Sequence, residues 1–133
     1  MNPNIASGYE TDFTKTAEFA RRTLSAGTLT GDRVVNGRNE ELGKIQELMI
    51  DLRSGRVAYA VLSFGGFLGM GDKYFAIPWQ AMRVDQVNRQ VVLDVDKSRL
   101  ESAPGFEKDN WPDMGNPDWG AQIHKYYNIP YER

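Results

Sequence analysis

One segment has a composition similar to that of a glycine-rich loop that binds phosphate. It is Gly-Phe-Leu-Gly-Met-Gly-Asp-Lys at residues 66–73. Such a loop has the pattern G-x-x-x-x-G-K-[ST], in which the lysine holds phosphate and the hydroxyl residue binds Mg²⁺. Here Asp72 follows Gly71 where the lysine belongs, and Tyr74 follows Lys73. A carboxylate in that place repels phosphate. The dinucleotide pattern G-x-G-x-x-G fails too, since Tyr74 stands where its third glycine belongs. The sequence therefore predicts no nucleotide site.

The residues that could bind a metal ion or act as a nucleophile form no convincing set. His124 is the only histidine, and Ser63 lies in a predicted strand without the G-x-S-x-G pattern of a nucleophilic serine. The absence of cysteine excludes disulfides, iron–sulfur clusters and thiolate zinc sites. A loose oxygen site for Ca²⁺ or Mg²⁺ is conceivable, although the spacing of a calcium loop is missing. Its candidate acids are Asp94, Asp96, Asp109, Asp113 and Asp118. We expect no enzyme, no cofactor and no resident metal.

The glycine-rich segment carries large apolar side chains at Phe67, Leu68 and Met70. Glycine allows a tight excursion of the backbone, which would project these side chains from the body of the protein. Exposed together, they would form the kind of apolar patch that marks a partner surface. We predict a protein-interaction surface here.

Length, composition and charge are those of one ordinary globular domain. The chain has 133 residues, 41% of them hydrophobic and 26% charged. Its 16 basic residues are scattered among 18 acidic ones and its net charge is −2, so DNA binding is not expected. No apolar run is long enough to span a bilayer, and residues 1–25 contain acids and no apolar leader segment. We expect a cytoplasmic protein without membrane insertion.

Short alternating segments predict strands from residue 29 onward. Asn36 and Gly37 favour a type I′ hairpin turn, because both residues accept positive φ. In residues 43–52 the alternation slips by one place near Glu47, which predicts a β-bulge. Residues 56–64 are apolar on both faces, as expected of a central strand that is covered on both sides.

The alternating pattern continues after the glycine-rich segment. Residues 73–77 predict a strand that ends at Pro78, because proline has no amide hydrogen to donate. Residues 82–87 and 90–95 predict two more strands joined by a tight turn. The count is about six strands with short links, so we predict an all-β fold, a small antiparallel β-barrel.

The two ends of the chain differ from this strand-rich centre. Residues 1–28 form a polar N-terminal arm, and we expect it to be disordered or partly helical. A narrow apolar stripe at helical spacing consists of Phe13, Ala17, Ala20 and Leu24. The arm is interpreted either as a frayed tail or as an arm that docks onto the barrel or a second subunit.

An aromatic C-terminal extension, residues 104–133, follows the predicted barrel of residues 29–103. Asn116 can cap a helix there, and Pro117 suits its first position. The apolar side of this helix consists of Trp119, Ile123, Tyr126 and Tyr127. We predict that these side chains cover an open end of the barrel or cross to another subunit, and we include them in the candidate interaction surface.

Several ordered segments resemble the PRC-barrel family. They are Leu-Thr-Gly-Asp at 29–32, Leu-Gly-Lys-Ile at 42–45, residues 57–79, Val-Leu-Asp-Val at 92–95 and Pro-Gly-Phe at 104–106. The family is named for the cytoplasmic domain of the photosynthetic reaction centre H subunit, and its barrel recurs in a bacterial ribosome maturation factor. The resemblance implies a small antiparallel β-barrel.

The resemblance also shapes the functional expectations, because the chain looks like the stand-alone bacterial members that extend the barrel with an aromatic tail. We expect a non-enzymatic interaction or adaptor module whose partner is a second copy or another protein. The alternative is an accessory factor in RNA processing or ribosome assembly, and the third possibility is a small-molecule or metal-binding protein.

Overall fold

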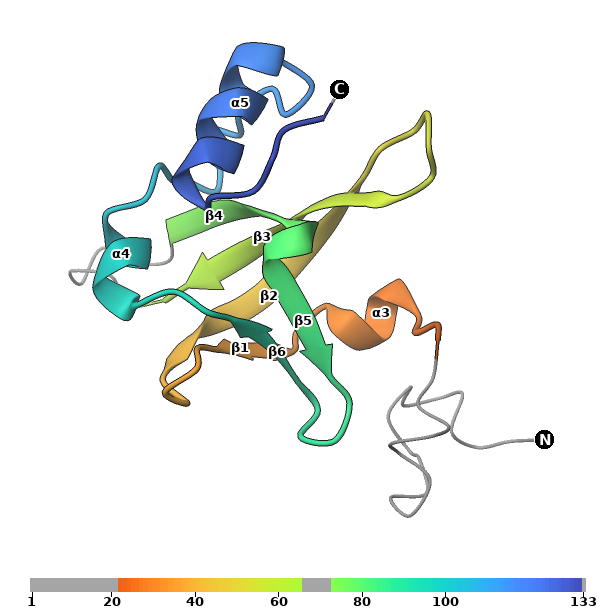
Figure 1. Ribbon diagram of the computed structural model, residues 1–133, viewed down its shortest axis with the longest axis vertical. Coiled ribbons are helices and arrows are strands. Elements are labelled where there is room, and N and C mark those ends of the chain that lie inside the picture. The colour runs from red at the N-terminus through yellow and green to blue at the C-terminus, as the bar shows by residue number, and fades with distance from the viewer. Residues whose placement is uncertain (1–21, 66–72, 133) are drawn as a thin grey trace.

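The computed structural model describes residues 22–65 and 73–132, which form one curled six-stranded sheet with short helices around it (Figure 1). The strands are β1 (Arg33–Val35), β2 (Glu41–Ile50), β3 (Val57–Phe64), β4 (Lys73–Pro78), β5 (Met82–Asp85) and β6 (Gln90–Leu93). The helices are α3 (Ala26–Leu29), the 3₁₀ helix η3 (Trp79–Ala81), α4 (Lys97–Glu101) and α5 (Pro117–Tyr126). The mostly β fold and the predicted number of strands are confirmed.

The sheet is mixed, which corrects the expectation of purely antiparallel pairing. The strand order is β4-β3-β2-β1-β6-β5, and β1 pairs with β6 in parallel, Val34 opposite Val91. It follows that β4 and β5 run in the same sense. The link between them, η3, therefore turns a corner from one edge of the sheet to the other. In the sequence, this three-residue link looks like a hairpin turn that would pair β4 with β5. The link instead joins the two edge strands, and for this reason the parallel pairing of β1 with β6 was not predicted.

The loop between β1 and β2 is also built differently from the predicted type I′ turn. Positive φ occurs at Asn39 (63°) and not at Gly37. The side-chain oxygen of Asn36 accepts hydrogen bonds from the backbone N–H groups of Arg38 and Glu40, both at 3.0 Å. Asn36 thus organises a longer loop through its side chain.

The predicted bulge and the predicted central strand are both confirmed. The pairing of β2 with β3 shifts between Ile45 and Glu47, so Gln46 is the extra residue. Strand β3 lies between β2 and β4, and its residues 59–62 are all buried. Burial of consecutive residues requires cover on both faces of the sheet.

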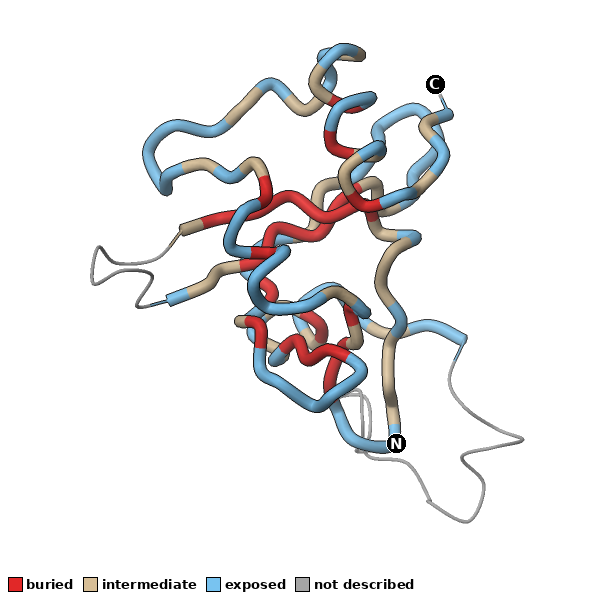
Figure 2. Tube along the Cα trace, turned by 60° about the vertical axis from the view of Figure 1, so that its left-hand side comes forward, coloured by how far each residue is buried: buried red, intermediate tan, exposed pale blue. Residues whose placement is uncertain are grey.

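The core includes residues on both faces of the sheet, since the successive residues Phe75, Ala76 and Ile77 of β4 all belong to it, and it extends to α5 (Figure 2). Its largest fully buried side chains are Phe75, Leu42, Ile45, Leu62, Ile77, Leu93, Leu100 and Ile123. The buried residues lie mainly along the strands, whereas the connecting loops are exposed. One core therefore joins strands from the whole sheet with residues of α4 and α5.

Some sequence predictions lie outside the described residues. They concern Phe67, Leu68 and Met70 in the glycine-rich segment, and Phe13, Ala17 and Ala20 in the N-terminal arm. Leu24 is described, and its side chain is partly buried against the core. No helix in residues 22–65 and 73–132 is both long and apolar enough to cross a membrane.

Candidate interaction surfaces

The acids and the histidine considered for metal binding do not come together. Within the described residues, no group of three or more histidine or acidic side chains could hold a metal ion. Asp96 pairs with Arg38 at 2.6 Å, and Asp113 accepts a hydrogen bond from the backbone N–H of Gly115 at 3.0 Å. These two acids satisfy local groups instead of sharing a ligand.

His124 has a structural setting on α5. Its Nδ1 lies 3.1 Å from the carbonyl oxygen of Pro130, and because a carbonyl can only accept, Nδ1 is the donor. The ring packs edge-on against Tyr59, with 5.6 Å between ring centroids, and lies 4.9 Å from the ring of Tyr131. His124 therefore ties the C-terminal tail to the sheet.

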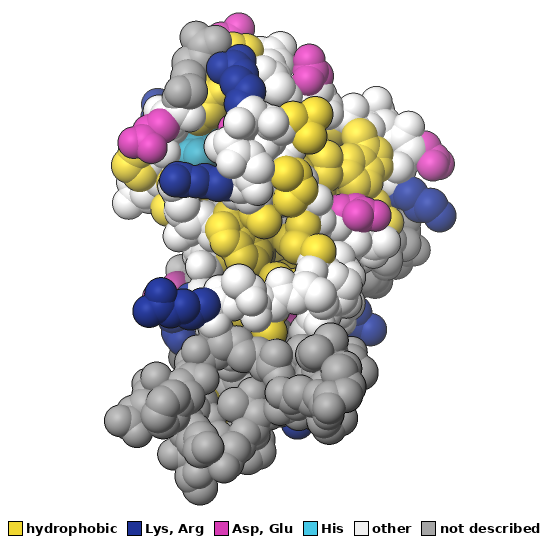
Figure 3. All heavy atoms as spheres, turned by 90° about the vertical axis from the view of Figure 1, so that its right-hand side faces the viewer, with side chains coloured by type: hydrophobic (Ala, Val, Ile, Leu, Met, Phe, Trp, Pro, Cys, Tyr) yellow, Lys and Arg dark blue, Asp and Glu magenta, His cyan; other side chains and the backbone are white. Residues whose placement is uncertain are grey.

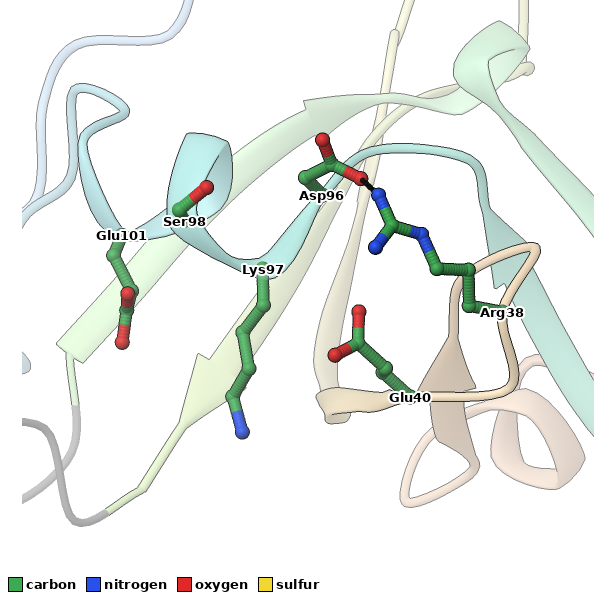
Figure 4. Close-up of a pocket in the computed structure, with 6 residues that line it drawn as sticks. All are labelled: Arg38, Glu40, Asp96, Lys97, Ser98 and Glu101. Atoms are coloured by element: carbon green, nitrogen blue, oxygen red, sulfur yellow. Dashed lines mark hydrogen bonds and ion pairs between the residues drawn. The ribbon is translucent and has the colours of Figure 1, made fainter.

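A shallow notch of about 360 Å³ lies between the β1–β2 loop and α4 (Figure 4). Arg38 reaches across it to Asp96, and Lys97 lies over the ring of Phe64, 5.6 Å from its centroid. The basic groups of the notch are thus already engaged with groups of this chain. Glu40 and Glu101 add negative charge to the lining, so the notch has no single sign of charge with which to select a ligand.

Helix α5 begins as the sequence predicts. The side chain of Asn116 accepts a hydrogen bond from the backbone N–H of Asp118 at 2.9 Å, and Pro117 occupies the first turn. The helix packs on the outer side of the sheet, where Trp119 meets Tyr59 edge-on with 5.1 Å between ring centroids.

This packing corrects part of the predicted interaction surface. Ile123 is 1% exposed and Tyr127 is 7% exposed, so both belong to the core and are not available to a partner. Trp119 and Tyr126 are partly buried against the same core. The aromatic stripe packs on the outer side of the chain's own sheet, whereas the sequence predicted cover for an open end of the barrel or a contact with another subunit.

Tyr126 holds α5 against α4. Its hydroxyl donates to the carbonyl oxygen of Arg99 at 2.5 Å, and the Arg99 guanidinium donates in return to the Tyr126 carbonyl oxygen. The guanidinium carbon also lies 4.3 Å from the centroid of the tyrosine ring. This reciprocal contact commits Tyr126 to the chain's own structure.

The apolar side chains that remain exposed lie elsewhere, and two of them are on the β2–β3 hairpin. Among the described residues, Leu52 is 94% exposed, Val87 50%, Ile50 46% and Trp111 38%. The β2–β3 hairpin projects beyond the rest of the sheet (Figure 1), and hydrophobic side chains gather on the face from which it projects (Figure 3). We name residues 50–56 the hairpin tip.

The hairpin tip also carries charge. The backbone N–H of Arg53 donates to the Asp51 carboxylate at 2.9 Å, and this bond holds the pKa of that carboxyl below its usual range. Arg53 and Arg56 are exposed. The tip therefore presents two apolar side chains, Ile50 and Leu52, beside negative and positive groups.

Trp111 belongs to an aromatic cluster with Tyr74 and Phe106. The centroid of its ring lies 5.9 Å from that of Tyr74 and 5.1 Å from that of Phe106. Phe106 exchanges two backbone hydrogen bonds with Tyr74, at 2.8 and 3.0 Å, along the outer edge of β4. This cluster lies beside the start of β4, at the opposite end of β3 from the hairpin tip.

Sequence reasoning missed Leu52, Ile50 and Trp111 as exposed residues. A signal for Leu52 exists, because it follows Asp51 and precedes the Arg-Ser-Gly of the turn, where an apolar residue has no sheet face to occupy. Trp111 offers no such signal, because an exposed tryptophan and a packed one look alike in sequence.

Comparison with known families assigns the chain. The family model of the PRC-barrel domain matches residues 22–100, more than half of the sequence. The chain belongs to the PRC-barrel family. The match agrees with the curled six-stranded sheet and confirms the resemblance seen in the sequence. It defines the fold and leaves the activity open, since function resides in the sites that a fold carries.

Comparisons with individual proteins add little on function. No curated protein matches the sequence. A matching solved structure is that of a putative 16S ribosomal RNA processing protein, RimM, from Pseudomonas aeruginosa, with 19% identity and a TM-score of 0.39. The match covers 61% of this chain and 49% of that one, so the PRC-barrel chain corresponds to about half of the RimM chain. No function is transferred from a likeness of this size.

Proposed function

We propose that this PRC-barrel protein is a non-enzymatic interaction module that self-associates. The observation that carries the proposal is the projecting hairpin with two exposed apolar side chains, Leu52 and Ile50. Water contact with such side chains is unfavourable, and full burial of an exposed one is worth about 1.5–3 kcal/mol, with a smaller gain for Ile50, which is 46% exposed. Exposed apolar groups at an extremity of a domain are typical of a contact surface.

The arrangement of polar groups supports a role without catalysis. In the part of the chain that the structure describes, the only histidine donates to a backbone carbonyl and packs between two tyrosines. The notch beside α4 is open and lined by charges of both signs. Neither arrangement brings a nucleophile together with a base.

A second contact surface would make the protein an adaptor. Residues 66–72 connect β3 to β4 in the sequence, and the aromatic cluster of Tyr74, Phe106 and Trp111 lies beside the start of β4. The apolar residues Phe67, Leu68 and Met70 remain our proposed partner surface at this end. A contact at each end of β3 would allow one copy to bind a twin and another protein at once.

The test of self-association is the molar mass in solution. Size-exclusion chromatography with light scattering, run from about 1 to 500 μM, is expected to show a mass that rises from 15.1 kDa toward twice that value. A mass that stays at one chain over the whole range would overturn self-association.

The adaptor part of the proposal has its own test. A variant with Phe67→Ser, Leu68→Ser and Met70→Ser is expected to keep the mass of the unaltered protein in solution but to lose proteins that co-purify with it from the native cell. An unchanged set of co-purifying proteins would remove the loop from the proposal.

The alternative, assistance to RNA processing, gains no support from the charges. Arg33 and Arg38 have carboxylates within 3.9 Å and 2.6 Å, and the net charge of the chain is −2. Co-sedimentation with ribosomal subunits at moderate salt tests this alternative. A stable, salt-resistant association with the subunits would replace the interaction module by this alternative.

A further inference from the structure

Strand β2 has an edge that is paired over only half of its length. Strand β1 pairs with β2 as far as Lys44, and the segment before β1 adds backbone bonds to Ile45, at 2.7 Å from Gly31 and at 2.9 Å to Asp32. Beyond Ile45, this edge of β2 has no backbone partner among the described residues. The unpaired edge covers residues 46–50, on the outward half of the hairpin.

The unpaired half of β2 ends in an apolar run, Leu48, Met49 and Ile50. Leu48 and Met49 are only partly buried, and Ile50 is 46% exposed, whereas Leu42 and Ile45 in the paired half are buried. Leu48 lies opposite Ala60 and Met49 opposite Tyr59, so successive residues of this run lie on opposite faces of the sheet. An apolar edge with free N–H and C=O groups is a template for another strand.

The charges beside this run indicate which strand fits. Glu47 precedes the apolar run and is exposed, and Arg53 follows it in the hairpin tip and is exposed. If two copies of this edge pair antiparallel with the two-fold axis at Ile50, the Glu47 of each copy lies opposite the Arg53 of the other. Parallel pairing would instead bring like charges together.

We propose that two copies of this chain pair antiparallel through the unpaired half of β2, forming a two-fold symmetric dimer with one sheet running through both. This inference rests on the proposed self-association and names its surface. An antiparallel pair of identical strands is its own complement under a two-fold axis, so the Glu47 of each copy meets the Arg53 of the other at two symmetric places. Asp51, between them in sequence, accepts a hydrogen bond from the backbone N–H of Arg53 within its own tip. Leu52, 94% exposed at the adjoining tip, would add a further apolar side chain to this interface.

The expected affinity follows from the length of the edge. Five unpaired residues and the adjoining tip make an interface at the small end of the range, where association is transient. We expect a dissociation constant on the order of 10 μM, well within the concentration range of the mass measurement above.

The first test compares Ile50→Lys with Val87→Lys. The two residues have nearly equal exposure, 46% and 50%, and both lie at the ends of β-hairpins, but only Ile50 is on the proposed edge. A lysine on the edge would place a charge inside the dimer. We expect the dissociation constant of Ile50→Lys to rise at least tenfold and that of Val87→Lys to stay within twofold of the unaltered protein.

The second test exchanges the charges. Glu47→Arg alone and Arg53→Glu alone each put like charges together at two symmetric places, and each is expected to raise the dissociation constant about fivefold to tenfold. The double variant restores opposite charges and is expected to recover at least half of that loss. Hydrogen exchange of residues 46–52, measured at 1 and 500 μM, is expected to slow at the higher concentration only.

The outcomes separate this inference from the function on which it rests. If the unaltered protein dimerises but Ile50→Lys dimerises equally well, or if the charge exchange restores nothing, the β2 edge is wrong and self-association stands. If the unaltered protein stays monomeric at 500 μM, both are wrong. Circular dichroism of each variant identifies any that has lost its fold, and the hydrogen-exchange result on the unaltered protein then decides the inference alone.

Discussion

Two buried polar side chains, Asn36 and Tyr127, differ in their hydrogen bonding. The amide of Asn36 is 4% exposed, and it donates to Glu40 at 2.8 Å and to the Val95 carbonyl at 3.1 Å while its oxygen accepts two backbone hydrogen bonds. The hydroxyl of Tyr127 is buried and has no hydrogen-bond partner within the described residues. An unpaired buried hydroxyl costs about 1–3 kcal/mol. The packing of the Tyr127 ring therefore stabilises the fold, whereas its hydroxyl lowers the stability.

Tyr127→Phe is therefore expected to raise the free energy of unfolding by about 1 kcal/mol, because it removes the unpaired oxygen and keeps the ring. The neighbouring Tyr126→Phe is the matched control. It removes the hydroxyl that donates to the Arg99 carbonyl and is expected to lower the free energy of unfolding by about 1 kcal/mol. Urea unfolding at pH 7 measures both. A clear loss of stability in Tyr127→Phe would mean that its hydroxyl has a partner.

The substitution Tyr127→Phe should also change how folding stability depends on pH above pH 10. Burial raises the pKa of Tyr127 above the ordinary value near 10. Above pH 10 the unfolded chain releases this proton while the folded chain keeps it, so folding stability falls as the pH rises. Burial also raises the pKa of Tyr59, to about 12, which adds to the same loss between pH 10 and 12. Tyr127→Phe should leave a shallower decline.

At the scale of elements, β2 joins the two halves of the sheet, and one glycine allows it to do so. Gly43 has φ of 140°, and a Cβ placed on it would lie 2.3 Å from the carbonyl oxygen of Ser63 in β3 and 3.2 Å from the side chain of Leu62. Only glycine permits this close approach of β2 to β3. Strand β2, which carries the proposed edge, can therefore lie this close to β3 because Gly43 has no side chain.

Gly43→Ala is expected to lower the free energy of unfolding by about 3 kcal/mol, from backbone strain and from the clash with β3. Gly27→Ala, in α3, has nothing within 4 Å of the added carbon and is expected to change the free energy of unfolding by less than about 1 kcal/mol. Thermal unfolding followed by circular dichroism compares the two. Equal midpoints for both variants would show that β2 can move away from β3.

The elements were the part of the structure most open to prediction. The slip of alternation near Glu47 and the Asn116 cap are local signals, and both reappear at those residues in the structure. The course of the chain between β4 and β5 was not predictable from local sequence. The direction of the turn at residues 79–81 depends on which edge of the sheet is open to pair with β5. The same holds for Ile123, whose burial depends on where α5 docks.

At the scale of the whole molecule, the barrel sheet and the aromatic extension form one cooperative unit. Ile123 and Tyr127 of the extension share a core with Leu62, Phe75 and Ile77 of the sheet. The family match ends at residue 100, yet the packing continues beyond it. Helix α5 covers part of the outer face of the sheet, where Trp119 packs on Tyr59.

Ile123→Ala is therefore expected to destabilise the entire fold by about 2–4 kcal/mol, the usual cost of a cavity in a packed core. Gln122→Ala, at the exposed neighbouring position, is expected to stay within about 0.5 kcal/mol of the unaltered protein. Urea transitions followed by tryptophan fluorescence and by circular dichroism should coincide in both variants. Two separate transitions would mean that α5 unfolds independently of the sheet.

The two backbone hydrogen bonds between Phe106 and Tyr74 limit how large an assembly can grow. They occupy part of the outer edge of β4, one of the two terminal strands of the sheet. The other terminal strand, β5, is four residues long and carries the exposed Arg83. In the proposed dimer, pairing through β2 would join two copies about a two-fold axis and use that edge in both. Because the ends of the joined sheet would be blunted, we expect growth to stop at two chains, so that an apolar strand edge that could seed a fibril would serve a closed pair instead.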